Sequence, residues 1–78
     1  MNDIYERLNE VFRDIFDDEK IVVNENTTAS DIEEWDSLEH INLIVAVEQE
    51  FGIKFNMGET VSLKNVGEMA ELISKKLN

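Results

Sequence analysis

Residues 36–52 have the sequence DSLEHINLIVAVEQEFG, and this stretch decides the fold. Asp36 is a favourable helix N-cap with Glu39 three residues later, and Gly52 is typical of a helix C-terminus. Between these ends, apolar residues recur at helical spacing over a very broad arc; they are Leu38, Ile41, Leu43, Ile44, Val45, Val47 and Phe51. We therefore expect a central helix that is buried on most of its circumference.

A narrow polar stripe completes the circumference of this helix. Its members are Glu39, Asn42, Ala46, Gln49 and Glu50. Because the apolar arc occupies the core, we expect the stripe to be exposed. It is then the surface of the helix that a partner protein could contact.

Two more amphipathic helices are predicted, one on either side of the central helix in the sequence. The first has Asp3 and Glu6 spaced as a capping box, and its apolar face comprises Ile4, Leu8, Val11, Phe12 and Ile15. The last follows Asn65 as N-cap with Glu68 at the third position, and its inward face comprises Val66, Met69, Ala70, Ile73 and Leu77.

The segments between these helices differ in length. Residues 17–35 have no helical period, and the run Ile21–Val23 is expected to pin this long loop to the core. Residues 53–55 are expected to be an extended linker before a short helical turn near Met57–Val61, because nothing else in the chain offers a strand to pair with. The predicted fold class is all-α: a small four-helix bundle of three main helices plus one short helix, with a long loop between helices one and two.

Length and charge limit the possible classes of function. The 78 residues suit a single domain spanning residues 1–78, and the formal net charge is −11. Between Ile21 and Ile53 lie eight acidic residues and no Lys or Arg, so nucleic acid and anionic lipid are unfavourable partners and basic proteins are the expected ones. No stretch approaches the roughly 20 apolar residues of a membrane span, and the N-terminus lacks the pattern of a secretory signal. We expect a cytoplasmic protein without membrane insertion.

The sequence offers few groups for catalysis or metal binding. His40 is the only His and Cys is absent, so neither a zinc site nor a thiol nucleophile can be proposed. Trp35 and His40 stand where a hydrophobic staple forms, and we interpret His40 as a partly packed residue at the helix boundary. The acidic run Asp31–Asp36 lacks the ligand order of a calcium-binding loop and is interpreted as a solvated loop. We expect no catalytic residue and no metal.

Ser37 is the residue whose position points to chemistry. It lies in the first turn of the central helix, where backbone N–H groups and the positive end of the helix dipole favour an anion. A phosphodiester on the Ser37 hydroxyl would therefore be stabilised there. Taken alone, however, Asp36-Ser37-Leu38 is more often an ordinary helix start.

A wider pattern resembles the phosphopantetheine-attachment region of acyl carrier proteins. It consists of Asp36-Ser37-Leu38, Ile41, Leu43, residues 47–53 (VEQEFGI) and Phe55. The order and lengths of the elements also resemble that family, from an amphipathic first helix and a long acidic loop to a closing helix after Asn65. The resemblance extends over the whole chain.

The resemblance implies a carrier function. A phosphopantetheinyl transferase would move phosphopantetheine from coenzyme A to Ser37, and the arm would carry acyl or aminoacyl groups as thioesters. Asp36 would cap the helix and help to present Ser37, while Leu38 would anchor the first turn at the partner contact. The recognition surface of the family falls here on Glu39, Asn42, Val45, Ala46 and Gln49.

The resemblance also implies the partners of this carrier. Besides the transferase, they are an acyl- or aminoacyl-loading ligase and transferase or synthase enzymes whose basic patches dock on the acidic surface of a monomer. Asn42 and Gln49 stand at positions where carriers of fatty-acid synthesis usually have acidic residues. With Trp35 directly before the motif, the sequence resembles standalone carriers of surface-polysaccharide, polyketide or aminoacyl-transfer systems. A specialised standalone carrier is therefore favoured, and fatty acyl, polyketide and aminoacyl cargoes all stay open.

Two other functions are compatible with parts of the sequence. An acidic binding module would share the bundle and use its negative surface, with Ser37 only as a helix start. A small hydrolase would use Ser37 as nucleophile and His40, three positions away on the same helix, as base, with no oxyanion stabiliser beyond the helix terminus. The carrier is the leading hypothesis, because it accounts for Asp-Ser-Leu within the wider pattern.

Overall fold

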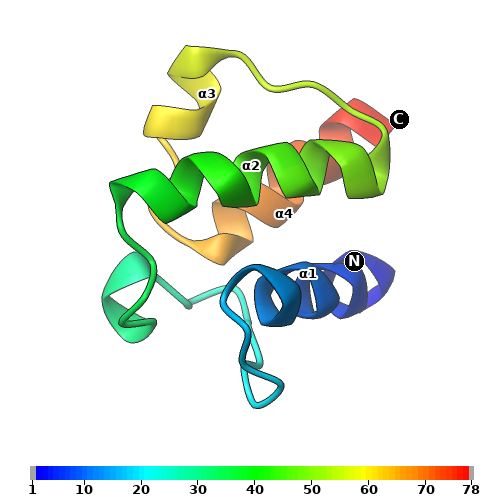
Figure 1. Ribbon diagram of the computed structural model, residues 1–78. Coiled ribbons are helices and arrows are strands. Elements are labelled where there is room, and N and C mark those ends of the chain that lie inside the picture. The colour runs from blue at the N-terminus through cyan, green and yellow to red at the C-terminus, as the bar shows by residue number, and fades with distance from the viewer. Residues whose placement is uncertain (1, 78) are drawn as a thin grey trace.

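Four α-helices and one turn of 3₁₀-helix make up the structure of residues 2–77, the part of the chain that the computed structural model describes (Figure 1). In chain order they are α1 (Asn2–Ile15), the 3₁₀ turn η1 (Ala29–Asp31), α2 (Ser37–Phe51), α3 (Met57–Val61) and α4 (Val66–Leu77). The all-α prediction is confirmed, and the short helix lies where it was predicted. No helix in this part of the chain is long and apolar enough to cross a membrane.

The core lies between α1, α2 and α4. These helices contribute the largest fully buried side chains, which are Leu8, Phe12, Leu43, Val47, Val66, Met69 and Ile73. Because burial of such a side chain contributes roughly 1.5–3 kcal/mol, this three-helix contact is the main stabilising feature of the fold. The short helix α3 contributes no buried residue and lies on the side of α2 away from α1 (Figure 1).

The expectation that α2 is buried on most of its circumference is wrong. The buried members of its apolar arc are Leu43, Ile44, Val47 and Phe51. The exposed members are Leu38, Ile41 and Val45. The reason is that α1 and α4 cover one side of α2, whereas the five-residue α3 is too short to cover the other. One side of α2 therefore presents apolar side chains to solvent.

Smaller corrections concern the other helices. Asp3 does not cap α1, because the helix already includes Asn2. Ile15 is only partly buried because α1 ends there, and Phe16 is the buried residue at this end. Leu77 is exposed instead of facing inward, because the last turn of α4 lies at the end of the bundle (Figure 1).

Both ends of α2 are fixed by specific contacts. Gly52 ends the helix in the left-handed conformation with φ 66°, as its position in the sequence predicts. Arg7 of α1 binds this end: its Nε lies 2.9 Å from Glu50 Oε2, it donates to the Glu50 carbonyl, and its guanidinium lies 4.3 Å from the Phe51 ring centroid. At the other end Asp36 Oδ1 accepts a hydrogen bond from a first-turn amide. The Arg7 contacts attach the end of α2 to α1, whereas Asp36 and Gly52 determine where the helix begins and ends.

The long loop between α1 and α2 is packed against both α1 and α4. Near its start, Asn9 Oδ1 of α1 accepts from the Val23 N–H at 2.7 Å, and Val23 is buried whereas Val22 of the predicted pinning run is exposed. Further along, the Thr27 carbonyl accepts from the Val66 N–H at 2.8 Å. The loop thus satisfies a first-turn donor of α4 that has no partner within the helix.

A close approach between this loop and α4 depends on Gly67. The Gly67 N–H donates to the Glu25 carbonyl at 3.1 Å, and a Cβ at residue 67 would lie 2.7 Å from that oxygen. We expect Gly67→Ala to destabilise the protein by about 1–3 kcal/mol in urea unfolding, because the loop backbone must shift. Gly58→Ala is the matched control, since its Cβ would meet nothing closer than Asn56 Oδ1 at 3.5 Å. Equal stability of the two variants would contradict this account of the loop.

Candidate functional site

Ser37 is the first residue of α2, and its side chain is exposed. The N-cap Asp36 accepts from the Glu39 N–H at 2.8 Å through Oδ1, and its own N–H donates to the Glu34 carbonyl at 3.1 Å. Within the described residues, the amides of Ser37 and Leu38 are the first-turn donors left for a ligand. An anionic group on the Ser37 hydroxyl would lie beside these donors and the positive end of the helix dipole.

Trp35 and His40 form the staple predicted at the start of α2. The indole Nε1–H donates to His40 Nδ1 at 3.0 Å, and the two rings lie edge to edge and nearly coplanar, with centroids 5.9 Å apart and 19° between their planes. On its other side, the indole packs edge-on against Phe12 of α1, with the centroids 5.2 Å apart. The segment just before Ser37 is thereby attached to the core.

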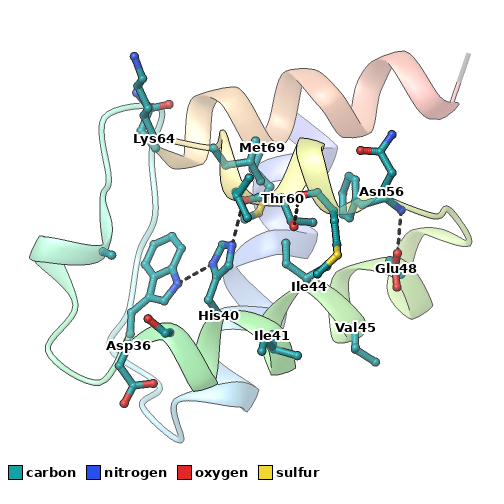
Figure 2. A pocket seen from close by; sticks show the side chains of 18 residues that line it. Asp36, His40, Ile41, Ile44, Val45, Glu48, Asn56, Thr60, Lys64 and Met69 are labelled. Carbon is teal, nitrogen blue, oxygen red and sulfur yellow. Dashed lines mark hydrogen bonds between the residues drawn. The ribbon is translucent and has the colours of Figure 1, made fainter.

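His40 also forms a hydrogen bond with α3. Its Nε2 lies 3.2 Å from the Thr60 carbonyl oxygen. Figure 2 marks the hydrogen bonds of the His40 ring with dashed lines. Because an indole N–H can only donate and a carbonyl can only accept, the neutral ring carries its proton on Nε2. Both ring nitrogens are engaged, so His40 is not free to take a proton from Ser37 and the hydrolase alternative lacks its base. The interpretation of His40 as a partly packed boundary residue is confirmed.

A largely apolar pocket of about 870 Å³ opens beside Ser37 between α2 and α3 (Figure 2). Its apolar lining includes Ile41, Ile44 and Val45 of α2, Met57 and Val61 of α3, and Met69 of α4. Ser37 and His40 line it at the start of α2, and Lys64 lines it from the segment before α4. The positive Lys64 ammonium makes the electrostatic potential at the pocket less negative than the acidic residues between 21 and 53 alone would make it.

The residues predicted for partner recognition lie on different parts of α2. Val45 is exposed on the apolar side, and Asn42 and Gln49 are exposed on the adjoining polar side, where Asn42 Nδ2 donates to Glu39 Oε1 at 3.3 Å. Ala46 is partly buried against the core, because it lies beside α1, so its prediction as an exposed stripe residue is wrong. The polar stripe therefore borders α1, whereas the side of α2 beside the pocket is apolar.

Exposed apolar side chains lie at the pocket and beside Ser37. We call Ile41, Val45, Met57 and Val61, which line the pocket, together with Leu38, which follows Ser37, the apolar face. Leu38 and Ile41 are 68% and 62% exposed, and Met57 and Val61 are 84% and 80% exposed. Sequence reasoning placed Ile41 in the core and gave Met57 and Val61 no role. The available signal was the width of the apolar arc of α2, which exceeds what one packed side of a helix accommodates.

The exposed carboxylates nearest to Ser37 in the chain come from the loop before α2. They are Asp31, Glu33, Glu34 and Asp36. On α2 itself, Glu39 is half-buried instead of fully exposed as predicted, and it accepts from Asn42 Nδ2. Glu48 accepts from the Phe55 N–H at 2.7 Å, and Glu50 is paired with Arg7. Among residues 2–77, no three His, Cys, Asp or Glu side chains are placed to hold a metal ion. The negative charge of the site therefore lies mainly beside the apolar face and not on it.

The short helix α3 is held in place by polar contacts at its ends. Asn56 and Glu59 form a capping box, with Asn56 N–H to Glu59 Oε1 at 2.9 Å and Glu59 N–H to Asn56 Oδ1 at 2.9 Å. Lys76 of α4 lies 3.0 Å from Glu59 Oε1 and 5.8 Å from the Phe55 ring centroid. The hydrogen bond from the Asn56 backbone, and then Lys76, lower the pKa of Glu59.

These features define a class of protein: a small helical carrier, whose exposed serine lies at the start of a helix beside an apolar pocket. Residues 6–73 match the family described as "Phosphopantetheine attachment site", so the chain belongs to this family, which includes the acyl carrier proteins. It is 30% identical over 77 residues to an acyl carrier protein of Petrotoga mobilis, covering 99% of this chain and 91% of that one. It is also similar to the solution structure of a holo acyl carrier protein from Geobacter metallireducens, with a TM-score of 0.88, 51% identity, and coverage of 94% of this chain and 84% of that one.

Family membership fixes the class of function. Members hold acyl groups as thioesters on a covalently attached phosphopantetheine arm and have no catalytic activity of their own. They act together with a phosphopantetheinyl transferase and with biosynthetic enzymes. The prediction of a non-enzymatic carrier is confirmed, and the acidic binding module is set aside.

The lowered pKa of Glu59 predicts how α3 responds to acid. Because the pKa is lower in the folded protein than in the unfolded chain, ionised Glu59 stabilises α3 above the unfolded-state pKa, and this contribution is lost as the pH falls through the folded-state pKa. We expect the Thr60 amide resonance to shift as the pH falls below the ordinary titration range of a glutamate, and Glu59→Gln to abolish this shift. Glu6→Gln on α1 should keep it, and an unchanged titration in Glu59→Gln would assign the shift to another group.

Proposed function

We propose that Ser37 is the residue that bears the phosphopantetheine arm. The exposed hydroxyl at the first position of α2, beside the first-turn amides and the apolar pocket, is the observation that carries this assignment. The residues match the group chemically, because a phosphodiester suits the positive end of a helix and an uncharged arm suits an apolar surface. The family match includes this position.

Asp36 and Leu38 have supporting roles in this proposal. Asp36 caps α2 and thereby fixes the backbone on which Ser37 stands. Leu38 is exposed next to Ser37, so its side chain is available to contact the partner enzyme at the attachment point. When bound, the arm supplies a terminal thiol for thioester formation, which a chain without Cys cannot supply itself.

The docking surface in this proposal has two parts. The apolar face supplies the short-range contact around Ser37, and the carboxylates of the preceding loop supply the attraction for a basic partner. A partner enzyme should therefore present an apolar patch with Lys or Arg residues at one edge. This modifies the expectation that partners contact mainly the polar stripe of α2.

The finer identity of the carrier is also part of the proposal. Asn42 and Gln49 are exposed amides at positions where acidic residues are usual, and this supports a specialised standalone carrier. In this proposal a dedicated ligase loads the acyl or aminoacyl cargo, and a transferase or synthase uses it. A monomeric state and a cytoplasmic location stay predictions. Recognition by these enzymes is expected to depend on Asn42, Val45 and Gln49 more than on Ala46, because Ala46 is partly buried.

Replacement of Ser37 tests the attachment site directly. Wild-type protein incubated with coenzyme A, Mg²⁺ and a broad-specificity phosphopantetheinyl transferase should gain the mass of one phosphopantetheine, and Ser37→Ala should gain none. Ser30→Ala is the matched control, because Ser30 is exposed in η1 and should leave the modification intact. Full modification of Ser37→Ala, or an unmodified wild-type protein with several transferases, would refute the assignment.

Substitution on the apolar face tests the docking surface. We expect Ile41→Ser to raise the KM of the transferase for this carrier about tenfold, because an exposed apolar contact at an interface centre is lost. Val22→Ser is the matched control: Val22 is 67% exposed, close to the 62% of Ile41, but lies in the loop. Added salt should raise KM by the same factor in both variants, because the loop carboxylates are unchanged. Equal KM values for the two variants at low salt would show that the apolar face does not dock.

A further inference from the structure

Three elements of the structure meet at the His40 ring. Nδ1 accepts from the Trp35 indole of the loop, Nε2 donates to the Thr60 carbonyl of α3, and the ring itself belongs to the first turns of α2. Figure 2 shows the two hydrogen bonds on opposite sides of the ring. All three residues line the pocket. The ring is therefore the polar connection between α3 and the segment that precedes Ser37.

The position of α3 depends on few contacts. The helix has five residues and none of them is buried, so apolar packing does little to hold it. Its polar attachments are the Thr60 carbonyl to His40 and the Glu59 carboxylate to Lys76. A group that enters the pocket between α2 and α3 thus meets less resistance from α3 than from the packed helices α1 and α4.

Displacement of α3 changes the environment of His40. Without the Thr60 carbonyl, nothing on α3 holds the ring proton on Nε2, and the tautomer of an imidazole is set by the hydrogen bonds of its two nitrogens. A ring with its proton on Nδ1 cannot accept from Trp35. The Trp35 N–H then loses a fixed acceptor. Because the Trp35 side chain is almost fully buried, an unpaired indole N–H is unfavourable and favours a rearrangement at this site.

We propose that His40 couples the position of α3 to the Trp35 segment, so that occupation of the pocket is transmitted to the attachment point. Trp35 is followed directly by the N-cap Asp36 and by Ser37, so a rearrangement at the indole reaches the surface that a partner enzyme contacts. This consequence rests on the proposed function of Ser37, whereas the coupling itself does not. In this proposal His40 is a positioning residue that distinguishes an empty carrier from one whose pocket is filled.

The coupling can be measured on protein that carries no arm. Removal of the capping box in Asn56→Ala/Glu59→Ala should release α3 without removing a buried side chain. We expect hydrogen exchange of the Trp35 indole N–H, followed by NMR, to become about tenfold faster in this variant than in the wild type. His40→Phe keeps an aromatic ring at this position but removes both hydrogen bonds. Exchange should therefore be equally fast in His40→Phe and in a variant that combines His40→Phe with the two α3 changes.

Two controls separate coupling from general loss of stability. Amide exchange in α1 and α4 should stay at the wild-type level in the α3 variant, and Arg7→Met, which removes a polar contact at the far end of α2, should leave the indole exchange unchanged. If the double variant does not fold, Lys76→Met, which removes the attachment of α3 to α4, should give a smaller acceleration of the same kind.

Several results would overturn the coupling. These are unchanged indole exchange after release of α3, a further acceleration when the α3 changes are added to His40→Phe, or an equal effect of Arg7→Met. Because Ser37 is unmodified throughout, failure of the indole exchange experiment does not affect the test of Ser37 as the phosphopantetheine attachment site. Failure of the Ser37 test likewise does not affect the measured coupling.

Discussion

Leu43 and Val47 of α2 are fully buried in the core shared with α1 and α4, and the other features of the protein depend on this one-sided contact. It fixes the axis of α2, so that the capped N-terminus holds Ser37 at the surface. It also leaves the opposite side of the helix without a long neighbour. Because α3 covers that side only in part, apolar side chains stay in contact with solvent and a pocket remains beside them. Exposed apolar surface of this kind is typical of a binding site.

Local signals in the sequence predicted the elements well, because they act over a few residues. Asp36 and Gly52 determine where α2 begins and ends, and the spacing of Trp35 and His40 predicts their contact. Burial was predicted less well, because exposure depends on the length of a neighbouring helix and not on the helical period of α2. The Thr60 partner of His40 comes from another element, and the Lys64 contribution to the pocket comes from a loop, so neither leaves a pattern in α2.

The separation of charge from apolar surface has a physical meaning for a carrier. In the proposed docking, loop carboxylates such as Glu33 and Glu34 would attract a basic partner from a distance, an effect that depends on ionic strength. Ile41 and Met57 would act only in contact, where loss of water from apolar surface contributes most of the free energy. Approach and final binding would then depend on different residues. A surface of this kind suits a protein that must meet several enzymes in turn and be released by each.

The tether of the long loop to α4 has a consequence for how such carriers diversify. On the loop side, the bonds of this tether use the backbone carbonyls of Glu25 and Thr27. A further bond runs from Arg13 Nε of α1 to the Ile21 carbonyl at 2.7 Å. Since the loop takes part in these bonds through its backbone, the exposed side chains of Glu33 and Glu34 can change without loosening them. The net charge of the loop beside Ser37 can therefore differ between sequences that keep the same scaffold. A change of charge there would alter the long-range attraction of a partner, while the folded bundle and the apolar face stay the same.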